Sequence, residues 1–194
     1  MYKKLFACCL LLTNIEIISA QRPATVPGNF SQPFVLGVTV SIPSGILQEA
    51  RTLNIYLPEV YGMDSTRAFP VIYLLDGSAD EDFIHTCGLV QFLTMTGTMP
   101  PTNLVGIANI DRRRDFTFPT TIAKDKTDYP TTGGSGKFMD FVAMELQPFI
   151  NQHFRTNLKN TIIGQSLGGL VATEILFHKP GIFSNYIIVS PSLW

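Results

Sequence analysis

The sequence predicts an α/β domain with a mainly parallel sheet, and three observations carry this prediction. Two early segments, 34–42 and 51–57, alternate between apolar and polar residues, as half-buried strands do. Segment 71–75 is continuously apolar, which is typical of a strand that is buried on both faces of a parallel sheet. Strand-like and helical segments alternate from there on, which predicts helices on both faces of that sheet.

The two opening segments are expected to pair as an antiparallel edge, with a turn at Pro43, Ser44 and Gly45. The elements after segment 71–75 are predicted in chain order: a helix over 83–94, a strand over 104–110, a long loop over 111–135, an amphipathic helix over 138–150, a short strand over 161–164, a helix over 167–177 and a last strand over 186–190. Doubly wound domains normally continue after such a strand, so an incomplete domain is expected.

Composition limits the classes of function. The 194 residues suit a single domain, and 45% of them are hydrophobic. The net charge of -1 gives no bulk attraction to nucleic acid or to an anionic membrane. We expect no transmembrane helix, because no run of about 18 apolar residues occurs. The sequence gives no prediction of oligomeric state.

The N-terminus has the features of an export signal. Lys3 and Lys4 precede a short apolar run at 5–12, and Ala20 offers a cleavage site before Gln21. The predicted organisation is a signal peptide (1–20), a polar arm (21–32) and an incomplete domain (33–194), in an exported protein that is periplasmic or secreted. A buried first helix is the alternative.

Removal of the signal peptide leaves Cys87 as the single cysteine, which predicts no internal disulfide and a buried, unreactive thiol.

The pentapeptide Gly164-Gln165-Ser166-Leu167-Gly168 matches G-x-S-x-G between a predicted strand and a predicted helix. A serine nucleophile there needs a very tight turn that lifts its oxygen above the sheet, and side chains at 164 and 168 would collide in that turn. The motif predicts an α/β-hydrolase with Ser166 as its catalytic nucleophile. The alternative is a glycine-rich turn with an incidental serine.

An oxyanion hole requires two backbone N–H groups near the nucleophile. One is expected from Leu167, the residue after the nucleophile. The other is expected from the loop after segment 71–75, where Gly77 lets the chain turn toward the site, and Ser78 is the predicted donor. A plain turn at the end of a strand is the alternative for Ser78.

A serine nucleophile also needs a histidine base and an acid that orients it, in the chain order serine, acid, histidine. Glu174 and His178 follow Ser166, but the predicted helix carries His178 roughly 18 Å away. His85 and His153 precede Ser166 on predicted helices. All three histidines are therefore interpreted as structural or solvated, and the triad acid and histidine are expected beyond residue 194.

Residues 111–115, with three consecutive arginines, follow a strand whose carboxyl end should face the same crevice. Either an arginine helps to bind an acidic or polar group of the substrate, or the loop is solvated and self-paired, which is the simpler interpretation. The motifs CxxC, HExxH, GxGxxG and the P-loop do not occur, so neither a metal nor a cofactor is expected.

Five segments together resemble the putative-esterase family of α/β-hydrolases, which includes esterase D-like and enterochelin esterase-like enzymes. These segments are RTLNIYLP (51–58), VIYLLDG (71–77), NIDRRRD (109–115), IGQSLGG (163–169) and SPSLW (190–194). The resemblance implies Ser166 as nucleophile and the amides of Ser78 and Leu167 as the oxyanion hole. Two departures are that many members have histidine where Gln165 stands, and that members continue well past the SPSLW segment.

The expected function is therefore hydrolysis of a small-molecule carboxylic ester through an acyl-serine intermediate. Two alternatives share these residues. One is an acyltransferase of the same fold, which passes the acyl group to an alcohol. The other is an inactive, truncated remnant that lacks the triad acid and histidine.

Overall fold

A six-stranded sheet lies at the centre of the computed structural model, which describes residues 32–193. The predicted signal peptide (1–20) lies outside the described residues, as does the predicted arm (21–32) except for its last residue. The strand order is β1-β2-β4-β3-β5-β6. The strands are β1 (Val38–Ser44), β2 (Glu49–Tyr56), β3 (Phe69–Leu74), β4 (Asn103–Ile107), β5 (Thr156–Gln165) and β6 (Asn185–Val189).

Strand pairing agrees with the predicted arrangement. β1 pairs antiparallel with β2, and β2 pairs antiparallel with β4. β4, β3, β5 and β6 are parallel to one another, so their carboxyl ends lie at one edge of the sheet. The first turn is placed differently from the prediction, because Pro43 and Ser44 still belong to β1 and the chain turns over residues 45–48. Pro43 is tolerated there because β1 pairs on one side only within the described residues.

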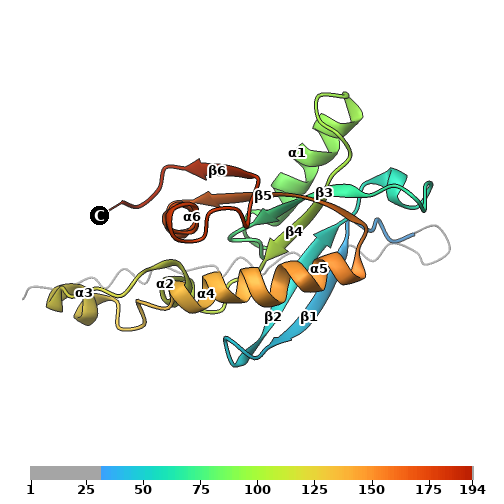
Figure 1. The fold of residues 1–194 in the computed structure, drawn as a ribbon. Helices are drawn as coiled ribbons and strands as arrows, with labels where there is room; N and C mark the ends of the chain where they lie inside the picture. The colour runs from blue at the N-terminus through green and yellow to red at the C-terminus, as the bar shows by residue number, and fades with distance from the viewer. Residues whose placement is uncertain (1–31, 194) are drawn as a thin grey trace, which may run out of the picture. The chain divides into compact units, whose positions relative to one another are not determined.

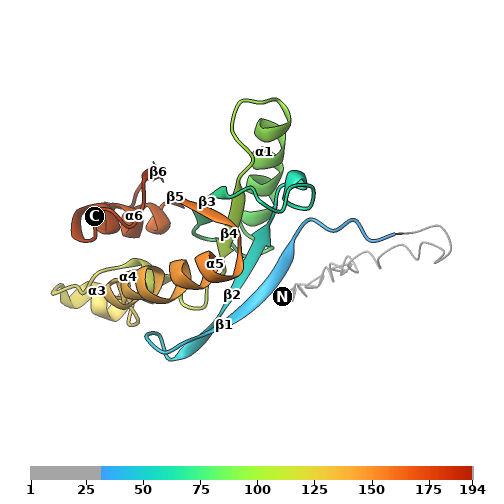
Figure 2. The ribbon, with the colours of Figure 1, turned by 45° about the vertical axis from the view of Figure 1, so that its right-hand side comes forward.

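Helices cover both faces of the sheet, as expected (Figure 1). They are α1 (Phe83–Met95), α2 (Arg112–Phe116), α3 (Ala123–Asp128), α4 (Ser135–Phe141), the π-helical segment η2 (Val142–Leu146), α5 (Gln147–His153) and α6 (Leu167–His178), with a single 3₁₀ turn, η1 (Glu59–Tyr61), before β3. Figure 2 shows α1 on the opposite side of the sheet from α4 and α5.

Two apolar cores correspond to the two faces. The smaller core joins Phe83, Cys87 and Val90 of α1 to strand residues such as Leu104. The larger core packs α4, η2, α5 and α6 against the other face. Cys87 is fully buried, and burial raises the pKa of its thiol to about 11, which agrees with the predicted unreactive cysteine.

The predicted long loop over 111–135 is wrong in part, since it contains the short helices α2 and α3. Asp111 explains α2, because its carboxylate accepts a hydrogen bond of 3.0 Å from the backbone N–H of Arg114 and caps the helix start. The segment predicted as one helix over 138–150 is a continuous helical stretch that includes a π-helical turn. That turn directly precedes Gln147 and Pro148, and Pro148 has no N–H to donate.

Candidate active site

Ser166 occupies the sharp turn between β5 and α6, which is the predicted strand–serine–helix arrangement. Its backbone has φ 55° and ψ -117°, a conformation that non-glycine residues rarely adopt. A Cβ atom added at Gly164 would lie 2.3 Å from the carbonyl oxygen of Gly168. The turn therefore closes so tightly that a side chain at Gly164 has no room, as the G-x-S-x-G spacing predicts.

The segment after β6 holds this turn from the other side. The N–H of Ser166 donates to the carbonyl of Val189 at 3.1 Å, and the N–H of Ser192 donates to the carbonyl of Ser166 at 3.1 Å. The hydroxyl oxygens of Ser166 and Ser192 are also 3.1 Å apart. Ser192 is not among the predicted site residues, although it belongs to the SPSLW segment at the end of the last predicted strand.

Ser166 lines a cavity of ≈ 450 Å³. The walls of this cavity come from the helices and the loop that follow β4, from the start of α6 and from the segment after β6. The lining residues are Arg112, Arg113, Thr117, Tyr129, Thr132, Ser166, Leu167 and Ser192. A second hollow of ≈ 300 Å³ adjoins Ser166 beside Asp76 and Glu81. The hydroxyl of Ser166 is thus accessible to a small molecule from the carboxyl edge of the sheet.

Asp76 and Arg112 form an ion pair that links three elements at this edge. Asp76 follows β3 and is 7% exposed, and its carboxylate accepts from Arg112 at 2.6 Å and 2.9 Å. Arg112 also donates to the carbonyl of Gln165, next to the nucleophile, at 3.3 Å. The hydrogen bond to Asp76 raises the pKa of Arg112 above its ordinary value against the opposing effect of burial. Arg112 therefore stays charged and connects α2 to the turn at Ser166.

A buried network of charged side chains connects α2 to strand β2. Arg51 of β2 and Asp115 of α2 are each 1% exposed and form an ion pair of 2.5 Å. Arg114 donates to Asp115 at 2.8 Å and to Glu49 at 2.5 Å, and Arg51 lies 2.6 Å from Glu49. These hydrogen bonds raise the pKa of Arg114. Burial raises the pKa of Glu49, but the hydrogen bond from Arg114 and the neighbouring positive charges outweigh it and lower that pKa overall.

The three arginines of segment 111–115 thus divide into two kinds. Arg112 and Arg114 are paired with carboxylates of the protein, as the self-paired interpretation expects. Arg113 is exposed, lines the Ser166 cavity and stacks with its guanidinium 4.5 Å from the ring centroid of Tyr129. Arg113 is consequently the arginine of this loop that is placed to meet a ligand.

The two residues expected to form the oxyanion hole lie in different surroundings. Leu167 lines the Ser166 cavity. Ser78 lines neither hollow beside Ser166, and its N–H donates to Glu81 at 3.4 Å, a long hydrogen bond. The N–H of Gly77 is occupied by the carbonyl of Ile107 at 3.0 Å. The assignment of Ser78 and Leu167 as oxyanion donors stays a prediction.

The chain has three histidines, and none of them lines either hollow beside Ser166. His178 ends α6 while Ser166 precedes its first residue, which separates the two by roughly 18 Å. His153 bonds to the carbonyl of Phe149 at 2.8 Å and stacks on that ring. His85 is exposed on α1. Glu174 accepts a hydrogen bond from the hydroxyl of Ser135 at 3.0 Å. These positions agree with the structural or solvated roles expected for the histidines.

Within residues 32–193, no group of three or more histidine, cysteine, aspartate or glutamate side chains is placed to hold a metal ion. None of the helices in the same residues is long and apolar enough to cross a membrane.

The fold and the turn at Ser166 define the class as α/β-hydrolase: a mainly parallel sheet, helices on both faces, and a serine between a strand and a helix. The chain belongs to the putative esterase family, whose sequence model matches residues 44–194. This result confirms the resemblance that the five sequence segments indicated.

Individual relatives agree with this assignment. Over 181 residues the chain is 32% identical to the ferri-bacillibactin esterase BesA of Bacillus subtilis, covering 86% of this chain and 62% of BesA. The IroE-like serine hydrolase of Shewanella oneidensis superposes with a TM-score of 0.74 at 40% identity, covering 81% of this chain and 51% of that one. The BES protein of Bacillus cereus superposes with a TM-score of 0.68 at 30% identity, covering 91% and 66%. The chain thus spans about half to two thirds of the length of these relatives.

Proposed function

We propose that Ser166 is the nucleophile of a carboxylic-ester hydrolase. The observation that carries the proposal is the rare backbone conformation of Ser166 at the mouth of a cavity of ≈ 450 Å³. In the first step the Ser166 oxygen adds to the ester carbonyl, a base accepts the serine proton and passes it to the departing alkoxide, and the C–O bond breaks to release the alcohol. In the second step water adds to the acyl-serine carbonyl and gives a proton to the base, the acyl–serine bond breaks to release the acid, and the base returns that proton to the Ser166 oxygen.

The negative oxygen of each tetrahedral intermediate needs hydrogen-bond donors. The N–H of Leu167 is one proposed donor, because it lies in the first turn of α6, where backbone N–H groups lack helical partners. The N–H of Ser78 is the second, and its long contact of 3.4 Å to Glu81 is weak enough to be exchanged for a ligand oxygen. Gly164 and Gly168 keep the turn at Ser166 tight.

The base for Ser166 is not supplied by the three histidines of this chain, given their positions. A serine hydroxyl without a base stays protonated and is a poor nucleophile. In this proposal the described residues supply the nucleophile, the cavity and the candidate oxyanion donors, and a group other than the three histidines accepts the proton.

For the substrate we propose an ester of the siderophore kind, because a relative in Aspergillus fumigatus, 35% identical over 85 residues, is named a siderophore triacetylfusarinine C esterase. Arg113, stacked on Tyr129 within the Ser166 cavity, is placed to bind an anionic group of such a ligand. BesA is named an esterase and the Shewanella oneidensis protein a serine hydrolase, which favours hydrolysis over acyl transfer. Export to the periplasm or the medium, by way of the signal-like residues 1–20, is part of the same proposal.

Fluorophosphonate labelling tests the nucleophile directly. We expect the label on Ser166 by peptide mass spectrometry, its absence in Ser166→Ala, and faster labelling as imidazole is added, because imidazole supplies a base. Labelling of a different serine, or imidazole-dependent labelling that persists in Ser166→Ala, would contradict the assignment.

A further inference from the structure

The peptide unit between Gln165 and Ser166 is held at both of its polar atoms. Its carbonyl oxygen accepts from Nη2 of Arg112 at 3.3 Å, and its N–H donates to the carbonyl of Val189 at 3.1 Å. Because a peptide unit is planar, these two contacts fix the plane from which the Ser166 backbone departs. The φ of 55° at Ser166 is unfavourable for a residue with a Cβ and persists only where the surroundings hold it. The direction of the Ser166 hydroxyl therefore depends on both contacts.

Arg112 is oriented in turn by Asp76. Nε of Arg112 donates to Oδ1 of Asp76 at 2.6 Å and Nη2 donates to Oδ2 at 2.9 Å, so the guanidinium meets the carboxylate with a pair of hydrogen bonds. A terminal guanidinium nitrogen carries a second hydrogen, and that of Nη2 serves the carbonyl of Gln165. Asp76 is itself fixed, because Asn109 donates to its Oδ1 at 2.7 Å and a Cβ added at Gly168 would lie 3.1 Å from its Oδ2. The carboxylate thus lies against the strand–helix turn and sets the direction of the guanidinium.

Asp76 also begins the loop that carries Ser78, the proposed second oxyanion donor. The backbone of Asp76 has φ 54°, which is rare for a residue with a Cβ, and its carbonyl accepts from the N–H of Asp82 at 3.0 Å. Asp76 and Arg112 are 36 positions apart, so their ion pair is a tertiary link between this loop and the turn at Ser166. The link sets the separation between the proposed nucleophile and the proposed donor.

We propose that Arg112 is a positioning residue for the nucleophile. Held by Asp76, it fixes the Gln165–Ser166 peptide and so directs the Ser166 hydroxyl toward an ester carbonyl bound at the loop that begins at Asp76. Arg112 acts through the backbone of Gln165 and not by binding substrate, which separates its role from that proposed for Arg113. This inference rests on the proposed ester chemistry at Ser166. Loss of Arg112 should therefore change the rate of reaction and leave ligand affinity unchanged.

Imidazole-assisted labelling with an uncharged fluorophosphonate separates rate from affinity. The labelling rate is measured at a fixed imidazole concentration over a series of probe concentrations, which gives a limiting rate and a half-saturating concentration. In Arg112→Gln the limiting rate should fall about tenfold or more, because a small misplacement of the reacting oxygen is costly. The half-saturating concentration should stay within about twofold of that of the unchanged protein, because the contacts that bind the probe remain.

Arg112→Lys separates the ion pair from the contact with Gln165. A lysine ammonium can pair with Asp76, but it lacks the planar fork that binds the carboxylate and the Gln165 carbonyl together. The midpoint of urea unfolding of Arg112→Lys should therefore lie close to that of the unchanged protein, whereas its limiting rate should stay about as low as in Arg112→Gln. An ion pair that served stability alone would restore the rate together with the stability.

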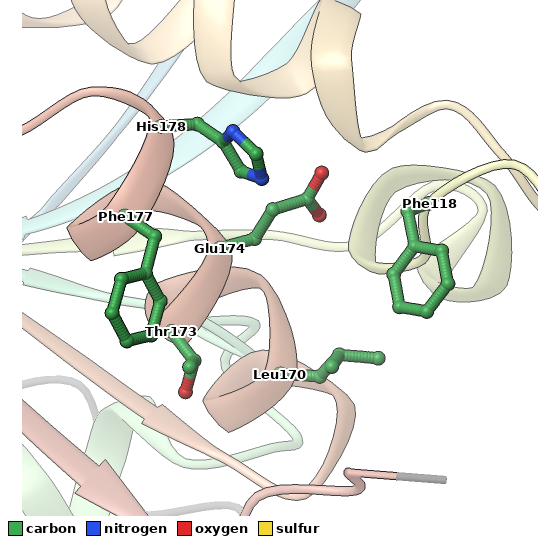
Figure 3. A pocket seen from close by; sticks show the side chains of 6 residues that line it. All are labelled: Phe118, Leu170, Thr173, Glu174, Phe177 and His178. Atoms are coloured by element: carbon green, nitrogen blue, oxygen red, sulfur yellow. The ribbon is translucent and has the colours of Figure 1, made fainter.

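Lys179→Gln is the matched control. The side chain of Lys179 is 31% exposed in its pair with Asp140, which is close to the 34% exposure of Arg112 in its own pair. Figure 3 shows Leu170 and His178 on different turns of α6, and Lys179 follows His178, so this pair lies at the far end of the helix from the nucleophile. Its loss should leave the limiting rate within about twofold.

An unchanged limiting rate in Arg112→Gln, full recovery in Arg112→Lys, or an equal loss in Lys179→Gln would overturn the positioning role. So would a raised half-saturating concentration at an unchanged rate, which would make Arg112 a ligand-binding residue. Circular dichroism checks the fold of each variant, and Arg112→Lys alone decides if Arg112→Gln does not fold. Failure of the proposed function gives a different result: the unchanged protein would not label at Ser166 at any imidazole concentration, and the positioning role would fall with it.

Discussion

Ser166 and Ser192 place their hydroxyl oxygens 3.1 Å apart although they are 26 positions apart in the chain. The N–H of Ser192 also donates to the Ser166 carbonyl, and the N–H of Ser166 donates to Val189. The rare backbone conformation of Ser166 is therefore held from two sides, by its own strand–helix turn and by the segment that follows β6. Ser192 is the side chain that connects this segment to the proposed reacting oxygen.

The first prediction concerns Ser192. If its hydroxyl donates to Ser166 as negative charge develops there, Ser192→Ala should slow imidazole-assisted phosphonylation of Ser166 by about threefold to tenfold, the usual value of one hydrogen bond. Ser192→Thr keeps the hydroxyl and should label at nearly the rate of the unchanged protein. The measurement is the labelling rate by intact mass spectrometry. An equal loss in the alanine and threonine variants would point to packing instead.

The second prediction is that the 194-residue chain labels slowly without imidazole, and that its histidines have no part in that rate. His85→Asn, His153→Asn and His178→Asn should each label within about twofold of the unchanged protein, because none of these side chains lines a hollow at Ser166. Rapid stoichiometric labelling of the unchanged protein that one of these substitutions abolishes would identify that histidine as the base. It would refute the assignment of all three histidines to structural or solvated roles.

The third prediction compares two glycines. A Cβ at Gly164 would lie 2.3 Å from a backbone oxygen, whereas a Cβ at Gly88 in α1 meets nothing within 4 Å. Gly164→Ala should lower the free energy of unfolding by about 3 kcal/mol or more, since backbone has to move. Gly88→Ala should raise it by about 0.5–1 kcal/mol through helix propensity. Urea unfolding followed by circular dichroism measures both, and a Gly164→Ala protein as stable as its parent would show that the turn is looser than described.

Local patterns were sufficient to predict the mainly parallel sheet, helix α1 and the turn at Ser166, because each is encoded by apolar periodicity or by glycine spacing within a few residues. The pairs Ser166–Ser192, Asp76–Arg112 and Arg51–Asp115 were not predicted. Their partners are 26, 36 and 64 positions apart, and no local pattern marks them. Helix α2 was missed for a different reason, since Asp111, its N-cap, is a local signal inside the segment that was interpreted as loop.

The fourth prediction concerns the buried pair Arg51–Asp115. Asp115→Ala leaves the buried Arg51 charge with Glu49 as its remaining carboxylate and takes a partner from Arg114 as well, and it should cost about 3–5 kcal/mol in the free energy of unfolding. The double variant Arg51→Met/Asp115→Leu removes both charges and should recover most of that loss. Asp128→Ala is the control, because its pair with Lys124 is exposed and should contribute less than about 0.5 kcal/mol. Equal losses from Asp115→Ala and from the double variant would mean that packing, not charge, dominates at this position.

The last prediction follows from Glu49, which accepts hydrogen bonds from Arg114 and lies beside Arg51. Its pKa is lowered in the folded protein from the ordinary value of 4.5, so the unfolded chain binds the proton more readily. The resulting stabilisation is fully present above pH 4.5 and is lost as the pH falls through the lowered pKa. Glu49→Gln removes this dependence. Urea unfolding of both proteins from pH 6 to pH 3 should show the parent more stable near neutrality and the two curves converging in acid, whereas curves that stay parallel would mean that Glu49 does not titrate between the folded and unfolded states.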